Sequence, residues 1–154
     1  MIFESQNIEF KESWRDEYLK WICGFANAQG GRLYIGMCDN GEVCGVENAK
    51  KLMEDIPNKV RDTLGILVDV NLKEKGGKEY LEVITDAYPY PISYKGQYHV
   101  RSGSTKQELK GVALDQFLLR RQGRTWDSVS LPFLKSLVSF ISESVASMSS
   151  IVGN

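Results

Sequence analysis

The sequence predicts an α+β fold, in which a mixed or antiparallel sheet with hairpins packs against two or three helices. Short runs of β-forming residues are separated by glycine-containing turns, which is typical of hairpins. Elsewhere, apolar residues recur at helical spacing and predict amphipathic helices between the strand runs. The 154 residues contain neither a regular βαβα alternation nor a G-x-G-x-x-G motif, so a Rossmann sheet is not expected.

The first third of the chain predicts a strand, a helix and a hairpin. Residues 7–11 alternate polar and apolar, which is typical of a short strand. Ser13 offers an N-cap for a helix that must end before the paired glycines 30–31. A second strand is expected over 33–37, and the turn residues 39–41 predict that the following segment pairs with it.

The middle of the chain predicts a second helix, a second hairpin and a third, short helix. Apolar spacing predicts the helix over 48–64, and Pro57 predicts a kink or a restart within it. Two β-rich runs within 67–84 are joined by the glycine turn 75–78, which indicates a hairpin. The short helix is expected over 112–121.

The character of the chain changes after Gly123, where an amphipathic helix is expected over 134–148. Such a helix could pack on its own domain, present a docking face to a partner, or lead into a further domain. The sequence therefore predicts one domain over 1–122 and an appendage over 123–154, with further domains in a longer protein.

The charge distribution is asymmetric. The formal net charge is −1, but residues 93–124 hold seven Lys/Arg against two Asp/Glu. Residues 1–92 hold eleven Lys/Arg against sixteen Asp/Glu. Such asymmetry indicates a surface that faces a polyanion, and a solvated basic face balanced by its acidic neighbour is the open alternative.

The sequence contains no membrane or export signal. No apolar stretch approaches the ~20 residues of a membrane helix, and no signal peptide is visible. We therefore expect a cytoplasmic protein without membrane contact. Cys23, Cys38 and Cys44 match no metal-ligand spacing, so core thiols are expected.

A polar loop from Arg101 to Lys106 has the composition of a phosphate-binding loop. A hairpin is expected around Lys95 and Gly96, and this loop follows it. Hydroxyls, a glycine and flanking cations can surround phosphate oxygens, although a plain polar turn would have the same composition. The Walker spacing is absent, so ATP binding is not expected. The residues predicted to contact phosphate are Arg101, Ser102, Ser104, Thr105, Lys106, Arg120 and Arg121.

Three carboxylates form a second candidate site. Glu4 and Glu9 could meet if the chain turns between them, and Asp39 could complete an oxygen site for Mg²⁺ or Mn²⁺. Such a metal would activate water for attack on a phosphodiester, with Lys11 beside the scissile phosphate. Surface acids are the open alternative, and Asp39 also suits a hairpin turn.

Two further groups favour structural roles. Asn27 is expected to hydrogen-bond locally at the end of the first helix and to fix the turn there. The tyrosines near the basic segment could stack bases, although half-buried sheet positions are the commoner explanation of such residues. They are Tyr88, Tyr90, Tyr94 and Tyr98.

Four ordered motifs resemble the Schlafen-type Alba-like domain, once labelled divergent AAA. Residues 4–13 resemble its E-x4-EFKES opening, and residues 24–36 resemble its AFANxxGGxLxIG core. Residues 39–45 resemble the DxGxxxG that follows, and residues 99–105 resemble its YxRxGSST motif. Many relatives carry an acid at the position of Cys38, one residue before the predicted third ligand.

The resemblance implies a nucleic-acid-binding module, for DNA or RNA. Bacterial members begin longer proteins described as transcriptional regulators or RecG-related helicase-like proteins, and a nucleotide-binding label travels with the older name. In animal Schlafen proteins two such domains clamp structured RNA, and some cut tRNA with acids matching Glu4, Glu9 and Asp39. A homodimer is therefore expected, and a Mg- or Mn-dependent endoribonuclease is the alternative function.

Overall fold

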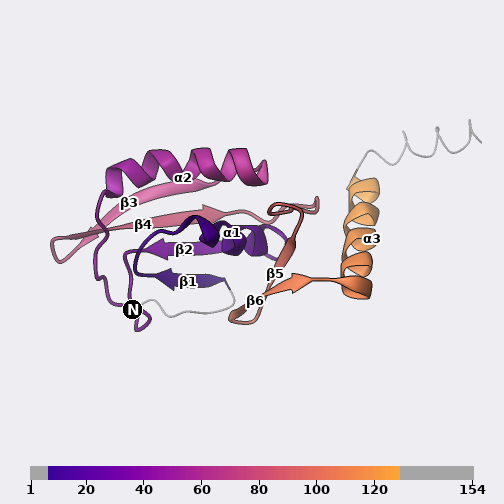
Figure 1. The fold of residues 1–154 in the computed structure, drawn as a ribbon, viewed down its shortest axis with the longest axis horizontal. Coiled ribbons are helices and arrows are strands. Elements are labelled where there is room, and N and C mark those ends of the chain that lie inside the picture. Colours follow the sequence, from indigo (N-terminus) through magenta and orange to yellow (C-terminus); the bar gives the residue numbers. More distant parts are fainter. Residues whose placement is uncertain (1–6, 129–154) are drawn as a thin grey trace, which may run out of the picture.

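The structure, a computed structural model, describes residues 7–128, where it contains strands, a 3-10 helix and α-helices (Figure 1). The strands are β1 (Ile8–Lys11), β2 (Gly31–Ile35), β3 (Asp69–Lys75), β4 (Lys78–Thr85), β5 (Tyr98–Ser102) and β6 (Thr105–Leu109). The helices are η1 (Asp16–Tyr18), α1 (Leu19–Ala26), α2 (Ala49–Leu64) and α3 (Gly111–Ser128). These elements confirm the α+β class.

The larger sheet has the strand order β1–β2–β4–β3. β1 and β2 are parallel, so α1 crosses over between them, whereas β4 is antiparallel to both β2 and β3. Glu9 of β1 lies beside Leu33 of β2, which lies beside Val83 of β4. Because side chains alternate between the faces of a sheet, Glu9 shares a face with these two buried apolar residues.

The main hydrophobic core lies between this face of the sheet and the helices α1 and α2. Its members with no exposed surface include Ile22, Phe25, Leu33, Ile56 and Leu81. Each fully buried side chain of this size contributes roughly 1.5–3 kcal/mol relative to an exposed one. Helix α1 of the β1–α1–β2 crossover is therefore part of this core and packs against β2.

A smaller cluster covers the opposite face of the sheet and consists of Phe10, Tyr34 and Met37. The hydroxyl of Tyr34 donates a hydrogen bond of 2.7 Å to the buried carboxylate of Glu82. Burial, together with this bond and the charge of Glu82, raises the pKa of Tyr34 to about 12. Tyr34 therefore stays a hydrogen-bond donor at neutral pH.

The hairpin β5–β6 forms a separate two-stranded sheet that packs against α1 beside the larger sheet (Figure 1). The close approach favours a glycine, because a Cβ on Gly24 would lie 3.3 Å from the backbone nitrogen of Arg101, closer than most Cβ contacts. From this position the side chain of Arg101 in β5 reaches Glu9 and the carbonyl of Ile8 in β1. Predicted site residues of both strands can therefore meet.

The first helix begins later than predicted. Ser13 makes no cap; instead η1 follows Arg15, and α1 starts only at Leu19. The carboxylate of Asp16 accepts a bond of 2.9 Å from Trp14 and one of 2.6 Å from Lys59 of α2. These side-chain contacts hold the segment before α1 in a tighter turn.

The second helix is continuous through Pro57, which corrects the predicted alternative of a restart. α2 runs from Ala49 to Leu64 with Pro57 inside it. The buried side chains of Ile56 and Val60 flank the proline and anchor both halves of the helix to the core. Tertiary packing therefore offsets the hydrogen bond that the proline removes.

The C-terminal part of the described chain differs most from the prediction. The polar loop 102–105 is the turn of the β5–β6 hairpin, and β6 was not predicted because its sequence lacks apolar alternation. The helix predicted over 112–121 is longer, and the predicted boundary after residue 122 falls within α3. The amphipathic helix expected over 134–148 lies outside the described residues. Within 7–128, no helix combines the length and apolarity that crossing a bilayer requires.

Candidate nucleic-acid interface

A buried ion pair joins the first and fourth sequence motifs. Arg101 of β5 donates from Nη1 to Oε2 of Glu9 in β1 at 2.7 Å, and 1% of the arginine side chain is exposed. Its Nη2 donates to the carbonyl of Ile8 at 3.1 Å, and its Nε donates to the carbonyl of Gly103 at 3.2 Å. The guanidinium therefore joins β1 to the β5–β6 turn.

Two aromatic rings of α1 enclose the same guanidinium. Its carbon lies 4.8 Å from the ring centroid of Trp21 and 5.2 Å from that of Phe25. Cation–π contacts of this kind are strongest where water is excluded. We call Glu9, Arg101, Trp21 and Phe25 the arginine junction.

Asn27 makes a local bond, as predicted, and long-range bonds as well. Its Nδ2 donates to Sγ of Cys23, four residues earlier in α1, at 3.5 Å. Its Nδ2 donates to the carbonyls of Ile92 and His99 at 2.7 and 2.9 Å, and its Oδ1 accepts from the Ile92 N–H at 2.8 Å. These partners are 65 and 72 residues away, so local sequence patterns contained no sign of them. Asn27 therefore also fastens the end of α1 to the segment before β5 and to β5 itself.

Arg121 of α3 is also buried against the body of the protein. It donates to the carbonyl of Tyr88 at 2.8 Å and to the carbonyl of Asn27. Its guanidinium carbon lies 5.2 Å from the ring centroid of Phe117. Two of the arginines predicted to contact phosphate thus form described bonds within the protein.

Three lysines converge beside the arginine junction. Lys11 of β1, Lys20 of α1 and Lys106 of β6 line a pocket of about 340 Å³ together with Glu17, Tyr18 and Trp21. We call it the lysine pocket. The predicted residues Lys11 and Lys106 meet here, whereas Lys20 was missed because a single helix lysine carries no distinguishing signal.

The aromatic rings of the lysine pocket hold the ammonium group of Lys11. This group lies 4.9 Å from the ring centroids of both Tyr18 and Trp21, and 3.5 Å from Oε1 of Glu9. Side-chain freedom is therefore restricted at Lys11, which lowers the entropic cost of binding an anion there.

The charges of the lysine pocket repel one another. Partial burial lowers the pKa of Lys106, and the charge of Lys20 lowers it further, while Glu108 acts in the opposite direction. The basic surface continues at Tyr94, where Lys20 and Lys95 lie 5.8 and 5.3 Å from the ring centroid. An anion entering the lysine pocket would relieve this repulsion.

The other residues predicted to contact phosphate lie at the surface. Ser102, Ser104 and Thr105 are exposed in the β5–β6 turn, where the Thr105 hydroxyl donates to the carbonyl of Ser102 at 2.9 Å. Arg120 is exposed on α3. Among the tyrosines that were predicted either to stack bases or to be half-buried, Tyr90 is the most exposed, at 53%, whereas Tyr88, Tyr94 and Tyr98 are half-buried or buried.

The predicted metal site is only partly within the described residues, because Glu4 precedes them. Glu9 is buried and paired with Lys11 and Arg101, and Asp39 is exposed in its turn. Between residues 7 and 128, no three His, Cys, Asp or Glu side chains are grouped so that they could hold a metal ion. The three-carboxylate site for Mg²⁺ or Mn²⁺ stays a prediction.

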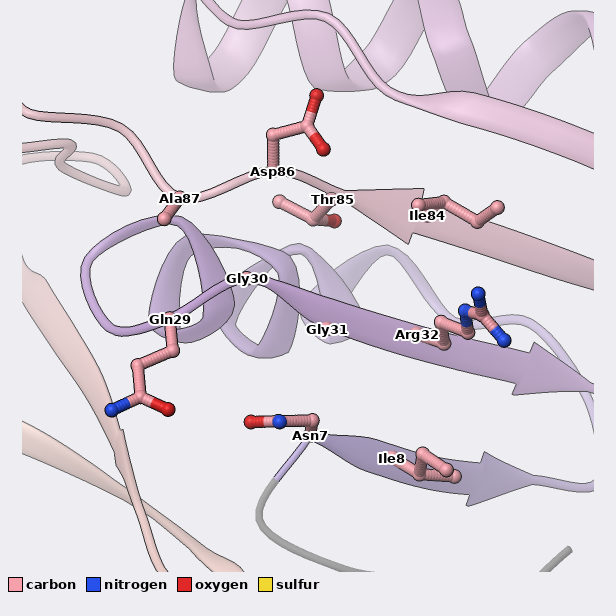
Figure 2. A pocket seen from close by; sticks show the side chains of 10 residues that line it. All are labelled: Asn7, Ile8, Gln29, Gly30, Gly31, Arg32, Ile84, Thr85, Asp86 and Ala87. Carbon is pink, nitrogen blue, oxygen red and sulfur yellow. The ribbon is translucent and has the colours of Figure 1, made fainter.

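A second pocket of about 340 Å³ lies where β1, β2 and β4 meet, at the start of β2 (Figure 2). Its centre is the backbone of Gly30 and Gly31, where a Cβ on Gly30 would lie 2.7 Å from the carbonyl oxygen of Thr85. Its charged side chains are Arg32 and Asp86, so the formal charges of its lining sum to zero. The lysine pocket is therefore the better candidate for an anion.

Comparison with known proteins places the chain in a family. The family model described as Schlafen, AlbA_2 matches residues 4–110. Among solved structures, the DIP2311 protein from Corynebacterium diphtheriae is similar, with a TM-score of 0.56 and 21% identity over 68% of this chain and 25% of that one. The chain thus spans about a quarter of that protein.

A second solved structure is the N-terminal domain of an ATP-dependent DNA helicase RecG-related protein from Nitrosomonas europaea. The match has a TM-score of 0.49 and 24% identity, and it covers 71% of this chain and 87% of that one. The search of curated proteins found no match. On the family match, which covers more than half of the residues and all four motifs, the chain belongs to the Schlafen, AlbA_2 family.

Proposed function

We propose that the chain is a nucleic-acid-binding module that contacts phosphates through the lysine pocket. The observation that carries this proposal is the convergence of Lys11, Lys20 and Lys106 from three separate elements around one pocket. Like charges gather at a protein surface at a cost in free energy, so a polyanionic ligand explains the arrangement better than folding does. Lys95 extends the basic surface beyond the lysine pocket, because it and Lys20 both lie over the ring of Tyr94.

The lysine pocket favours contacts to the backbone rather than to bases. The ring faces of Tyr18 and Trp21 already meet Lys11, and Trp21 also meets Arg101. These contacts occupy aromatic surface that a stacked base would use. Phosphate contacts carry no sequence information directly, so we propose that other domains of a longer regulator or helicase-like protein choose the target.

The proposal predicts binding that weakens steeply with salt. Fluorescence anisotropy with labelled tRNA and duplex DNA between about 50 and 200 mM salt would measure the slope of log K against log salt. Because each phosphate contact on duplex DNA contributes a slope of about 0.9, Lys20→Gln and Lys106→Gln should each reduce the slope by about that amount.

The matched control is Lys50→Gln, which removes the same charge from an exposed position on α2. Its slope should equal that of the unaltered protein. Absence of binding at the lowest salt concentration, or equal slopes for all the variants, would contradict the proposal. We also propose that the module acts as a homodimer, for which α3 offers exposed apolar residues.

A further inference from the structure

We infer that the lysine pocket selects a terminal phosphate, the monoester at the end of a nucleic-acid chain, over the phosphodiesters within it. This inference rests on the proposed function and names the part of the nucleic acid that the pocket takes. The evidence is the net charge of the residues that line the pocket, the closeness of its lysines and the contact of its aromatic rings with Lys11.

The charge of the lysine pocket matches a dianion. Its lining contains three ammonium groups and one carboxylate, that of Glu17. Behind it, Glu9 and Arg101 neutralise each other at 2.7 Å. A phosphate monoester carries about −1.5 to −2 at pH 7, whereas each internal phosphodiester carries a single charge. The net charge of +2 on the pocket therefore complements a chain end better than a chain interior.

The lysines that line the pocket are held close together in the absence of a ligand. Lys106 is partly buried, and both its burial and the nearby Lys20 disfavour its charged form. Lys11 is fixed between two rings and Glu9. A ligand with two charges compensates this repulsion more completely than a ligand with one, because Coulomb energies scale with the product of the charges.

Neighbouring depressions lack this charge excess. The pocket in Figure 2 is lined by one cation and one anion, Arg32 and Asp86. A third depression, at the start of α2, is lined by Glu12, Glu47 and Asp55 against the single cation Lys51. Neither can attract a dianion more strongly than a monoanion, and a pocket on α3 holds the single cation Arg120. The preference should therefore depend mainly on the lysine pocket, which has the larger positive charge.

The experiment compares single-stranded oligonucleotides of one sequence that differ only at their ends: a 5′-phosphate, a 3′-phosphate, or hydroxyls at both ends. We expect one phosphorylated form to bind about tenfold more tightly than the hydroxyl form, which corresponds to about 1.4 kcal/mol. Lys20→Gln and Lys106→Gln should each reduce this ratio to below about twofold. Lys50→Gln should leave the ratio unchanged.

The outcomes separate the inference from the proposed function. Equal affinity for all three oligonucleotides, with binding intact, overturns the inference and leaves the proposed function standing, whereas no binding to any of them overturns both. A preference that persists in both Lys20→Gln and Lys106→Gln places the selection elsewhere and overturns the inference. A phosphorylated mononucleotide that binds as tightly as the oligonucleotide also overturns it, because the ligand would then be free nucleotide. Circular dichroism of each variant confirms that it is folded. If Lys106→Gln does not fold, the binding ratio of Lys20→Gln, a substitution on α1, decides the test.

Discussion

At the scale of single residues, Arg101 and Glu9 show how a motif can mislead. Both are charged, and the sequence predicted that each would bind a ligand. Their side chains, however, are 1% and 9% exposed. Removing either partner leaves the other buried without compensation, which costs more than the pair itself contributes. The two residues therefore depend on each other for stability before they can serve any ligand.

We expect Arg101→Met to lower the free energy of unfolding by about 3–5 kcal/mol, because Glu9 would remain buried and unpaired. Urea denaturation followed by circular dichroism would measure this change. Arg120→Gln is the matched control, since Arg120 is exposed on α3, and it should change stability by less than about 0.5 kcal/mol. Equal stability of the two variants would show that the buried pair is not required.

The same reasoning affects any test of the nuclease alternative. Glu9→Gln would disturb the arginine junction, so a loss of tRNA cleavage in that variant would not identify a metal ligand. Asp39 is exposed and lacks this structural role, which makes it the more informative carboxylate to replace.

At the scale of elements, local signals predicted those elements whose ends are fixed locally. The β3–β4 hairpin was predicted from its Gly76–Gly77 turn, where both residues have positive φ. The end of α1 was likewise predicted from Gly30. By contrast, β6 has no apolar alternation, and it is a strand because it pairs with β5 along its whole length.

The candidate site was harder to predict than the elements. Sequence analysis identified Lys11 and Lys106, but as parts of two different sites, and Lys20 was not identified. Convergence depends on the crossover of α1 and on the docking of the β5–β6 hairpin, and both are long-range events. Composition can show that a segment is basic, but it cannot show whether a given arginine is buried in the protein or exposed at its surface.

Asn27 is the residue on which docking of the hairpin depends most directly. In Asn27→Ala, the Ile92 N–H loses its acceptor and the His99 carbonyl loses the Asn27 donor, at a cost of about 1–3 kcal/mol for each group left unsatisfied. The Ile92 carbonyl also loses Asn27 but keeps the bond of 3.2 Å from Sγ of Cys23. We expect hydrogen exchange to accelerate at Ile92 and in β5 more than in the β3–β4 hairpin. Uniform acceleration across both sheets would contradict a local docking role.

At the scale of the whole molecule, α3 stands apart from the layered body of the domain (Figure 1). Phe117 and Arg121 anchor the helix to the body, whereas Val112 and Leu119 are 72% and 68% exposed. Exposed apolar residues on a projecting helix are typical of an interaction surface when they lie together. They support the proposed homodimer.

Sedimentation equilibrium over a range of concentrations tests this proposal. We expect a reversible dimer whose dissociation constant rises at least about tenfold, or 1.4 kcal/mol, in Leu119→Glu, because a charge would enter an apolar interface. Leu67→Glu introduces the same charge at a position that is 72% exposed before β3, and it should not change the constant. A monomer at every concentration, or equal effects of the two exchanges, would contradict dimerisation through α3.

The arginine junction has a consequence for how such chains are classified. Glu9, Phe25, Asn27 and Arg101 come from three of the motifs that identify the family, and all four are buried together. A match to these motifs therefore identifies residues that stabilise the interior of the fold. It does not identify the residues that would contact a ligand. Of the three lysines that would meet a ligand in the lysine pocket, only Lys11 belongs to a motif, whereas Lys20 and Lys106 fall outside all of them. Members that share the signature can thus differ in activity, and assigning a role to any one of them requires inspecting residues outside the motifs as well.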